Sequence, residues 1–140
     1  MRIMAIDYGD ARTGVAVSDP TGLLAGYTTV IHSRKPEQAA AELAALAKEH
    51  GAEELVLGFP RNMDGTEGPR AEKCREFAGL VEAACGIRPV LWDERRTTVE
   101  AHGILHAGGK KMKQHKKNVD AVAASLILEG YLTYKKTQLR

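Results

Sequence analysis

Short runs of apolar and β-branched residues, separated by polar turns, open the chain. Residues 2–7 and 13–18 are two such runs, and the segment between them, 8–12, carries the glycine and aspartate of a tight turn. A third run follows at 26–31. This pattern predicts a β-hairpin followed by a third strand, which together form an antiparallel meander.

The apolar spacing then changes from the period of a strand to that of a helix. Residues 36–50 begin with a proline, are rich in alanine and leucine, and are followed by Gly51, a common signal for the end of a helix. From 69 to 85 the apolar positions recur at helical spacing, and Gly86 follows. Both segments are predicted to be helices.

Two brief apolar runs, 54–59 and 89–92, are typical of buried parallel strands. The rest of the chain is predicted to form a helix, a loop rich in glycine and lysine, and a final helix, over residues 97–107, 108–117 and 119–134. This alternation of strands and helices predicts one α/β domain over residues 1–140. Its mixed sheet has five strands in the order 3-2-1-4-5 and is flanked by helices.

Length and composition exclude several classes of protein. The 140 residues suffice for one domain with its own core, and no apolar run approaches the roughly 20 residues of a membrane-spanning helix. The amino terminus lacks the pattern of a signal peptide, so we expect a cytoplasmic protein without membrane association. Cys74 and Cys85, about 16 Å apart along one predicted helix, are expected to be reduced packing residues.

Basic residues are concentrated in the last part of the chain. Residues 1–87 hold 9 Lys and Arg against 13 Asp and Glu, whereas residues 88–140 hold 11 against 5. Such an excess suits a polyanionic partner, although a solvated basic loop without a partner has the same composition. The candidate phosphate contacts in this loop are Lys110, Lys111, Lys113, Lys116 and Lys117.

Three acids are candidates for a metal site. Asp7 closes the first predicted strand and Glu94 closely follows the fifth, and the carboxyl ends of parallel strands are where an open α/β sheet carries its site. Asp120 lies in the first turn of the last predicted helix, after a plausible cap at Asn118. Three carboxylates that meet need a cation, and oxygen ligands suit Mg²⁺ or Mn²⁺.

Each of these acids alone has an ordinary explanation, as a turn former or as a partner of a helix dipole, and only the set of three indicates chemistry. A bound divalent ion would support hydrolysis of a phosphodiester without a protein nucleophile. The sequence leaves open whether one ion or two would bind.

Other polar residues could contact nucleic acid. Arg61 and Asn62 lie in a long loop, 58–68, after a predicted strand, and Arg12 and Arg95 lie next to the proposed acids. Each arginine alone is more often an ordinary surface charge. His102 and His106 have a spacing compatible with zinc, but no other zinc ligands accompany them, so we do not expect a zinc site.

These segments together resemble the YqgF family of Holliday-junction-resolvase-like proteins, which are regarded as pre-16S rRNA nucleases with a ribonuclease H-like fold. The likeness covers nearly the whole chain and rests on the segments 7–16, 58–68, 93–101 and 119–129. It implies that Asp7, Glu94 and Asp120 occupy the family's acidic positions. Two departures are small, Phe59 where leucine is usual and Asn118 where some relatives carry lysine.

The resemblance leaves the substrate open between ribosomal RNA precursor and branched DNA, and we favour RNA. Two other functions are compatible with parts of the pattern. An ATPase or sugar kinase uses the same opening motif but needs two such domains, and a non-catalytic module could bind nucleic acid through its lysines alone. A resolvase would act as a homodimer, whereas an RNA-trimming enzyme could be a monomer.

Overall fold

The computed structural model describes residues 2–19, 21, 25–60, 64–93 and 119–138. Most predicted elements are present, with small changes at their ends. In chain order the helices and strands are β1 (Arg2–Asp7), β2 (Arg12–Ser18), β3 (Ala25–His32), α1 (Pro36–His50), β4 (Ala52–Phe59), α2 (Pro69–Cys85), β5 (Val90–Asp93) and α5 (Val119–Gln138). The helix predicted over 97–107 and the loop over 108–117 lie outside the described residues.

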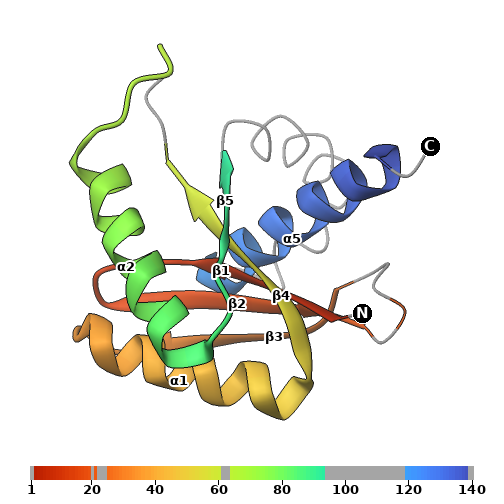
Figure 1. The fold of residues 1–140 in the computed structure, drawn as a ribbon. Helices are drawn as coiled ribbons and strands as arrows, with labels where there is room; N and C mark the ends of the chain where they lie inside the picture. Colours follow the sequence, from red (N-terminus) through yellow and green to blue (C-terminus); the bar gives the residue numbers. More distant parts are fainter. Residues whose placement is uncertain (1, 20, 22–24, 61–63, 94–118, 139–140) are drawn as a thin grey trace.

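The five strands form one mixed sheet in the order β3-β2-β1-β4-β5, which confirms the predicted order (Figure 1). β1 pairs antiparallel with β2, and β2 pairs antiparallel with β3. On its other side β1 runs parallel to β4, and β4 runs parallel to β5. The carboxyl ends of β1, β4 and β5 therefore lie at one edge of the sheet.

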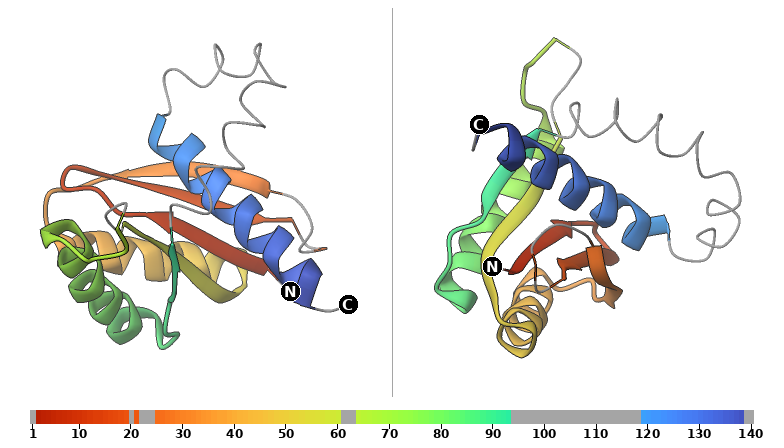
Figure 2. Two further views of the ribbon diagram at one scale, coloured as in Figure 1. Left: turned by 90° about the horizontal axis from the view of Figure 1, so that it is seen from above. Right: turned by 90° about the vertical axis from the view of Figure 1, so that its right-hand side faces the viewer.

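Helices cover both faces of the sheet, with α1 and α2 on one side and α5 on the other (Figure 2). The side chains of β1 alternate between these layers, as strand geometry requires. Met4 and Ile6 belong to the core under α1 and α2, whereas Ile3 and Ala5 belong to the core under α5. Any residue of β1 can thus be assigned to a face by its position in the strand.

Proline and glycine set the ends of the first two helices. α1 and α2 begin at Pro36 and Pro69, where the missing amide hydrogen costs nothing, and they end at Gly51 and Gly86. Both glycines have left-handed backbone angles, with φ of 66° and 75°. The sequence signals for these two helices are confirmed.

Two further expectations concern single features. Cys74 is buried in the core under α2, and both it and Cys85 are free thiols, as predicted. No helix in the described part of the chain is long and apolar enough to cross a membrane.

Candidate active site

Asp7 is the last residue of β1 and is half-buried at the carboxyl edge of the sheet. It follows Ala5 by two positions, so the alternation of the strand assigns it to the face that α5 covers. The strand-end position predicted for this acid is therefore confirmed. Its face is the one on which the last helix begins.

Gly58 lies beside Asp7 in the neighbouring strand. The register pairs Ile6 with Leu57 in β1 and β4, and it pairs Gly58 with Trp92 in β4 and β5. Val56 and Trp92 both pack under α5, so position 58 belongs to that face as well. Because glycine has no side chain, β4 places no side chain on this face next to Asp7, and the Gly58 backbone itself is buried.

The side chains of two of the three predicted carboxylates are not among those that the structure describes. Glu94 lies outside the described residues, and Asp120 is described only as a backbone position in the first turn of α5. Among the described side chains, no group of three His, Cys, Asp or Glu residues lies close enough to hold a metal ion. The meeting of Asp7, Glu94 and Asp120 stays a prediction.

Most of the predicted nucleic-acid contacts also lie outside the described residues. Arg12 is described: it is exposed and begins β2, on the far side of the turn that follows Asp7. The residues of this set that lie outside the description are Arg61, Asn62, Arg95, Lys110, Lys111, Lys113, Lys116 and Lys117. Their roles stay predictions.

The turn between β1 and β2 is held by a side chain that the sequence did not single out. Arg70 of α2 donates from Nη2 to the backbone oxygen of Tyr8 at 2.5 Å, and its Nη1 lies 3.5 Å from Oδ1 of Asp10. Lys73, one helical turn further on, lies 3.6 Å from the same oxygen. The sequence does show two cations three residues apart on a predicted helix. It could not show what they contact, because their partners are about sixty residues away in sequence.

Gly9 is required within this turn for a steric reason. A β-carbon at this position would lie 2.3 Å from the backbone oxygen of Arg12, well inside any allowed contact. A larger residue would push the turn away from its present path. Gly9 and Arg70 therefore both fix the backbone that directly follows Asp7.

Tyr8 faces the opposite side of the sheet from Asp7. Its ring stacks on that of Phe77 in α2, with ring centres 3.9 Å apart and planes 12° apart. Burial, and then the negative charge of Asp10, raise the pKa of the Tyr8 hydroxyl. Two successive residues at the end of β1 thus serve two different surfaces, one under α5 and one beside α2.

Comparisons with known proteins agree with this arrangement. A family profile described as "RuvX: Holliday junction resolvase" matches residues 1–134. The chain belongs to this family. It is 44% identical over 135 residues to a "Putative pre-16S rRNA nuclease" of Carboxydothermus hydrogenoformans, covering 96% of this chain and 98% of the relative. A relative of the same name from Halothermothrix orenii is also 44% identical, covering 96% of each chain.

Solved structures show the same fold at low sequence identity. RuvC of T. thermophilus, in complex with a Holliday junction substrate, matches with a TM-score of 0.75 at 13% identity, over 99% of this chain and 96% of that one. The large terminase nuclease of the thermophilic phage G20c matches with a TM-score of 0.58 at 14% identity, over 92% and 80%. The ribonuclease H-like fold is thereby confirmed.

Membership of the RuvX family assigns the chain to the nucleases, with nucleic acid as the substrate. Nucleases of this fold generally use divalent metal ions. The alternative of an ATPase or sugar kinase, which needs two such domains, is not supported by the family match.

Proposed function

We propose that this RuvX-family protein is a divalent-metal-dependent endonuclease, one domain over residues 1–140, that processes the precursor of 16S ribosomal RNA in the cytoplasm. The observation that carries the proposal is the position of Asp7. Asp7 ends a strand on the face under α5, and the neighbouring strand position on that face, Gly58, carries no side chain.

The chain pattern supports convergence of the other two acids on that face. Position 120 precedes the buried Ala124 by four residues, so it falls on the same stripe of α5 that packs on the sheet. A residue two positions after Trp92 would share the face of Trp92 if the strand continued. Asp7, Glu94 and Asp120 would then border one space beside Gly58.

A set of three carboxylates fits Mg²⁺ or Mn²⁺, because both ions prefer oxygen ligands. When bound, such an ion supplies an activated water and offsets the charge of the leaving oxygen. The chain itself positions its ligands: Gly9 and Arg70 fix the backbone after Asp7, and the packing of α5 fixes the position of residue 120.

RNA is favoured over branched DNA because of the names of two relatives that are 44% identical to this chain. Both are named as pre-16S rRNA nucleases, and the match covers almost their full length. The similarity to RuvC at 13% identity supports the fold alone. The name of the family profile keeps junction cleavage as the second candidate. A junction-cutting enzyme would act as a homodimer, whereas RNA trimming requires only a monomer.

The test incubates purified protein with pre-16S rRNA and with a four-way DNA junction, each with Mn²⁺, Mg²⁺ or EDTA. We expect metal-dependent cleavage of the RNA, and its loss in Asp7→Asn with retention of RNA binding. The matched control is Asp19→Asn, which changes a half-buried acid next to the opposite end of β2 and should leave cleavage unchanged. Cleavage of the junction alone would make resolution the function.

Absence of cleavage on either substrate with either ion, together with intact binding, would show a non-catalytic module. Equal cleavage by Asp7→Asn and the wild type would remove Asp7 from the site.

A further inference from the structure

A cavity lies on the other side of β1 from Asp7. It has a volume of about 320 Å³, near the lower end of the roughly 300–1,000 Å³ of small-ligand pockets. One wall is a stripe of α2 that includes Lys73, Glu76 and Phe77, and the opposite wall is the start of α1 with Arg34 before it. Tyr8 and Asp10, in the turn after β1, close the end.

The apolar part of this cavity is built on aromatic rings. The half-buried ring of Tyr8 stacks on Phe77, which is only 1% exposed, and Leu80 and Pro36 extend the apolar lining. The Tyr8 hydroxyl can donate as well as accept a hydrogen bond. The accessible aromatic surface is that of Tyr8, and it suits a flat, apolar-faced ligand.

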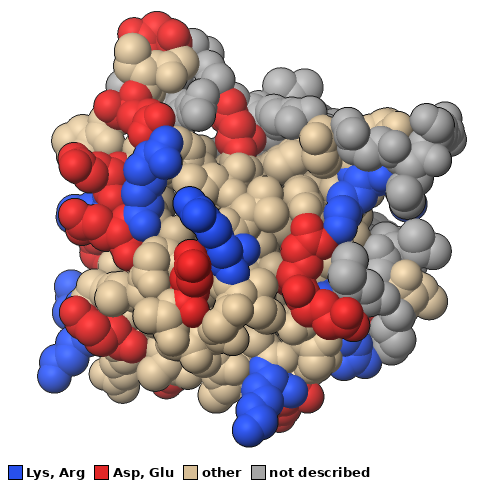
Figure 3. Space-filling view, in the orientation of Figure 1, with Lys and Arg blue, Asp and Glu red and all other residues tan. Residues whose placement is uncertain are grey.

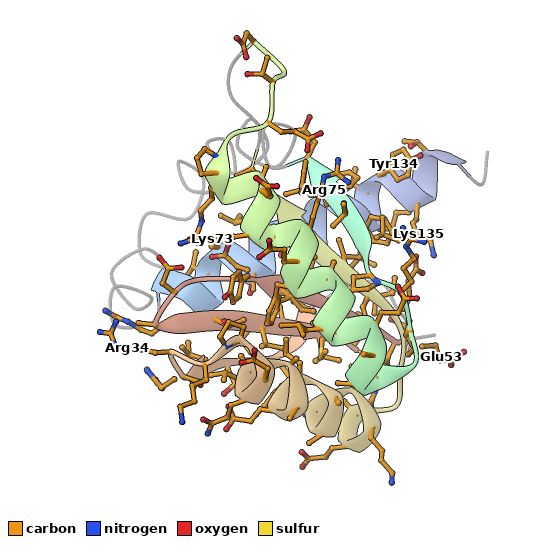
Figure 4. The ribbon with its side chains drawn as sticks, turned by 60° about the vertical axis from the view of Figure 1, so that its left-hand side comes forward. Arg34, Glu53, Lys73, Arg75, Tyr134 and Lys135 are labelled. Carbon is orange, nitrogen blue, oxygen red and sulfur yellow. The ribbon has the colours of Figure 1, made fainter. Side chains whose placement is uncertain are left out.

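The charged residues of the lining are mixed, with three acids and two bases. Asp10, Glu37 and Glu76 face Arg34 and Lys73, and Asp10 already contacts both Lys73 and Arg70. Figure 4 shows Lys73 on α2 and Arg34 before α1 extending toward the same side of the molecule. Acidic and basic side chains are also interspersed over α2 in Figure 3. Neither a free phosphate nor a cation is favoured by such a set.

A neutral heteroaromatic ring fits these properties, because it combines an apolar face with hydrogen-bond donors and acceptors on its edge. We propose that the cavity between the β1–β2 turn, α1 and α2 binds an unpaired nucleobase. The source that we favour is a nucleotide of the substrate, since the cavity ends at the turn that directly follows Asp7. This form of the inference rests on the proposed function.

The test compares an exposed residue that lines the cavity with one that does not. Glu76→Trp should fill the cavity, whereas Glu82→Trp changes an exposed residue of the same helix outside it and serves as the matched control. Binding of a short single-stranded oligoribonucleotide is measured in EDTA, with an abasic nucleotide placed at each position in turn. Circular dichroism checks that both variants are folded.

We expect one abasic position to weaken binding to the wild type and to Glu82→Trp by about tenfold, the size of one stacked base. Glu76→Trp should bind intact and abasic strands equally. A change below about twofold at every position, or an unchanged abasic effect in Glu76→Trp, would overturn the substrate-base assignment.

A second measurement separates the two sources of the base. Equilibrium dialysis with AMP and with UMP tests whether the cavity holds a free nucleotide. If it does, the nucleotide should bind the wild type and Glu82→Trp but not Glu76→Trp. If AMP or UMP binds saturably but no abasic position weakens binding of the oligoribonucleotide, the cavity is assigned to free nucleotides. If neither measurement shows binding at the cavity, the site is refuted. A failure of the proposed function differs, because then the wild type would cleave neither RNA nor junction whatever the cavity holds.

Discussion

Arg75 donates from Nε and Nη2 to the two carboxylate oxygens of Glu67, at 2.8 and 2.9 Å, while its guanidinium carbon lies 4.8 Å from the centre of the Phe59 ring. Phe59 ends β4, and Glu67 lies just before α2. One side chain therefore contacts both ends of the segment that carries Arg61 and Asn62. The planar fork of arginine matches a carboxylate and an aromatic face together.

The first prediction concerns this contact. In Arg75→Lys the charge is kept, but the paired hydrogen bonds and the stacking on Phe59 are lost. Because the pair is exposed, we expect little change in thermal stability and a several-fold weaker binding of RNA. Arg88→Lys is the control, since Arg88 approaches Glu82 through a single contact of 3.9 Å. Equal RNA affinity in wild type and Arg75→Lys would show that this contact does not position the segment.

The second prediction concerns Gly9. In Gly9→Ala the added β-carbon meets the backbone oxygen of Arg12, so the turn after Asp7 must shift. Displacements of about 1 Å near a reacting group can cost about a hundredfold in rate, and we expect a loss of that order in kcat/KM for cleavage. Circular dichroism should show a folded protein.

Gly79→Ala provides the matched substitution. Gly79 is exposed within α2, and a β-carbon there would meet nothing within 4 Å. Alanine is the better helix former, so the free energy of unfolding should rise by about 0.5–1 kcal/mol with unchanged cleavage. A similar fall in activity in both variants would show that the Gly9 effect is not local.

Much of the fold can be predicted from the sequence, because the apolar patterns of helices and strands involve residues close together in the chain. Short apolar and β-branched runs identified the strands, and Gly51 and Gly86 marked the ends of the helices. Element ends were less readable. β4 begins at Ala52 because this residue pairs with Arg2, and α5 continues beyond the predicted end at residue 134 to Gln138.

The candidate site could be predicted only where it depends on a strand end. Asp7 could be placed in this way, whereas the contacts of Arg70 with the turn after β1 could not, because they join residues 62 positions apart. The contacts of Glu54 with Tyr131 and Lys135 span 77 and 81 positions and leave no local pattern either. The cavity beside α2 likewise depends on three separate segments.

The third prediction concerns Gly58, whose position faces α5 between Asp7 and Trp92. In Gly58→Val two methyl groups would occupy the space beside the proposed metal ligands. We expect overpacking to cost about 1–3 kcal/mol of stability and metal-dependent cleavage to be lost. Gly58→Ala should be intermediate in both. Titration of cleavage with Mn²⁺ is the measurement, and wild-type activity in folded Gly58→Val would place the metal elsewhere.

The fourth prediction concerns pH. Tyr131 of α5 donates to Glu54, which also accepts from Lys135, and burial followed by the Glu54 contact raises the pKa of Tyr131. The unfolded chain then releases this proton at lower pH than the folded protein. The stabilisation is thus complete below the ordinary tyrosine pKa of about 10 and is lost as the pH rises above it.

Urea unfolding between pH 9 and 11 or so tests this linkage. One proton changes stability by at most about 1.4 kcal/mol per pH unit, and Tyr131→Phe should lose stability less steeply than the wild type above pH 10. Identical slopes in Tyr131→Phe and the wild type would contradict the assignment.

The fifth prediction concerns the basic segment near the carboxyl-terminal helix. Conversion of Lys110, Lys111 and Lys113 to alanine should weaken RNA binding across sequences, because phosphate contacts release counterions. The slope of log affinity against log salt should become shallower by about 2, given a contribution of about 0.7 for each contact to a single strand. Binding isotherms at several salt concentrations measure this slope.

General loss of positive charge would have a different signature from loss of contacts. The control replaces three exposed cations elsewhere by alanine, namely Lys48, Arg88 and Lys136. This variant changes the net charge equally. It should leave the salt slope almost unchanged, because these residues are not expected to contact phosphates. If both triple variants reduced the slope equally, the segment 110–117 would act only through net charge. The recognition of RNA would then depend on the surface around Asp7 and Arg12.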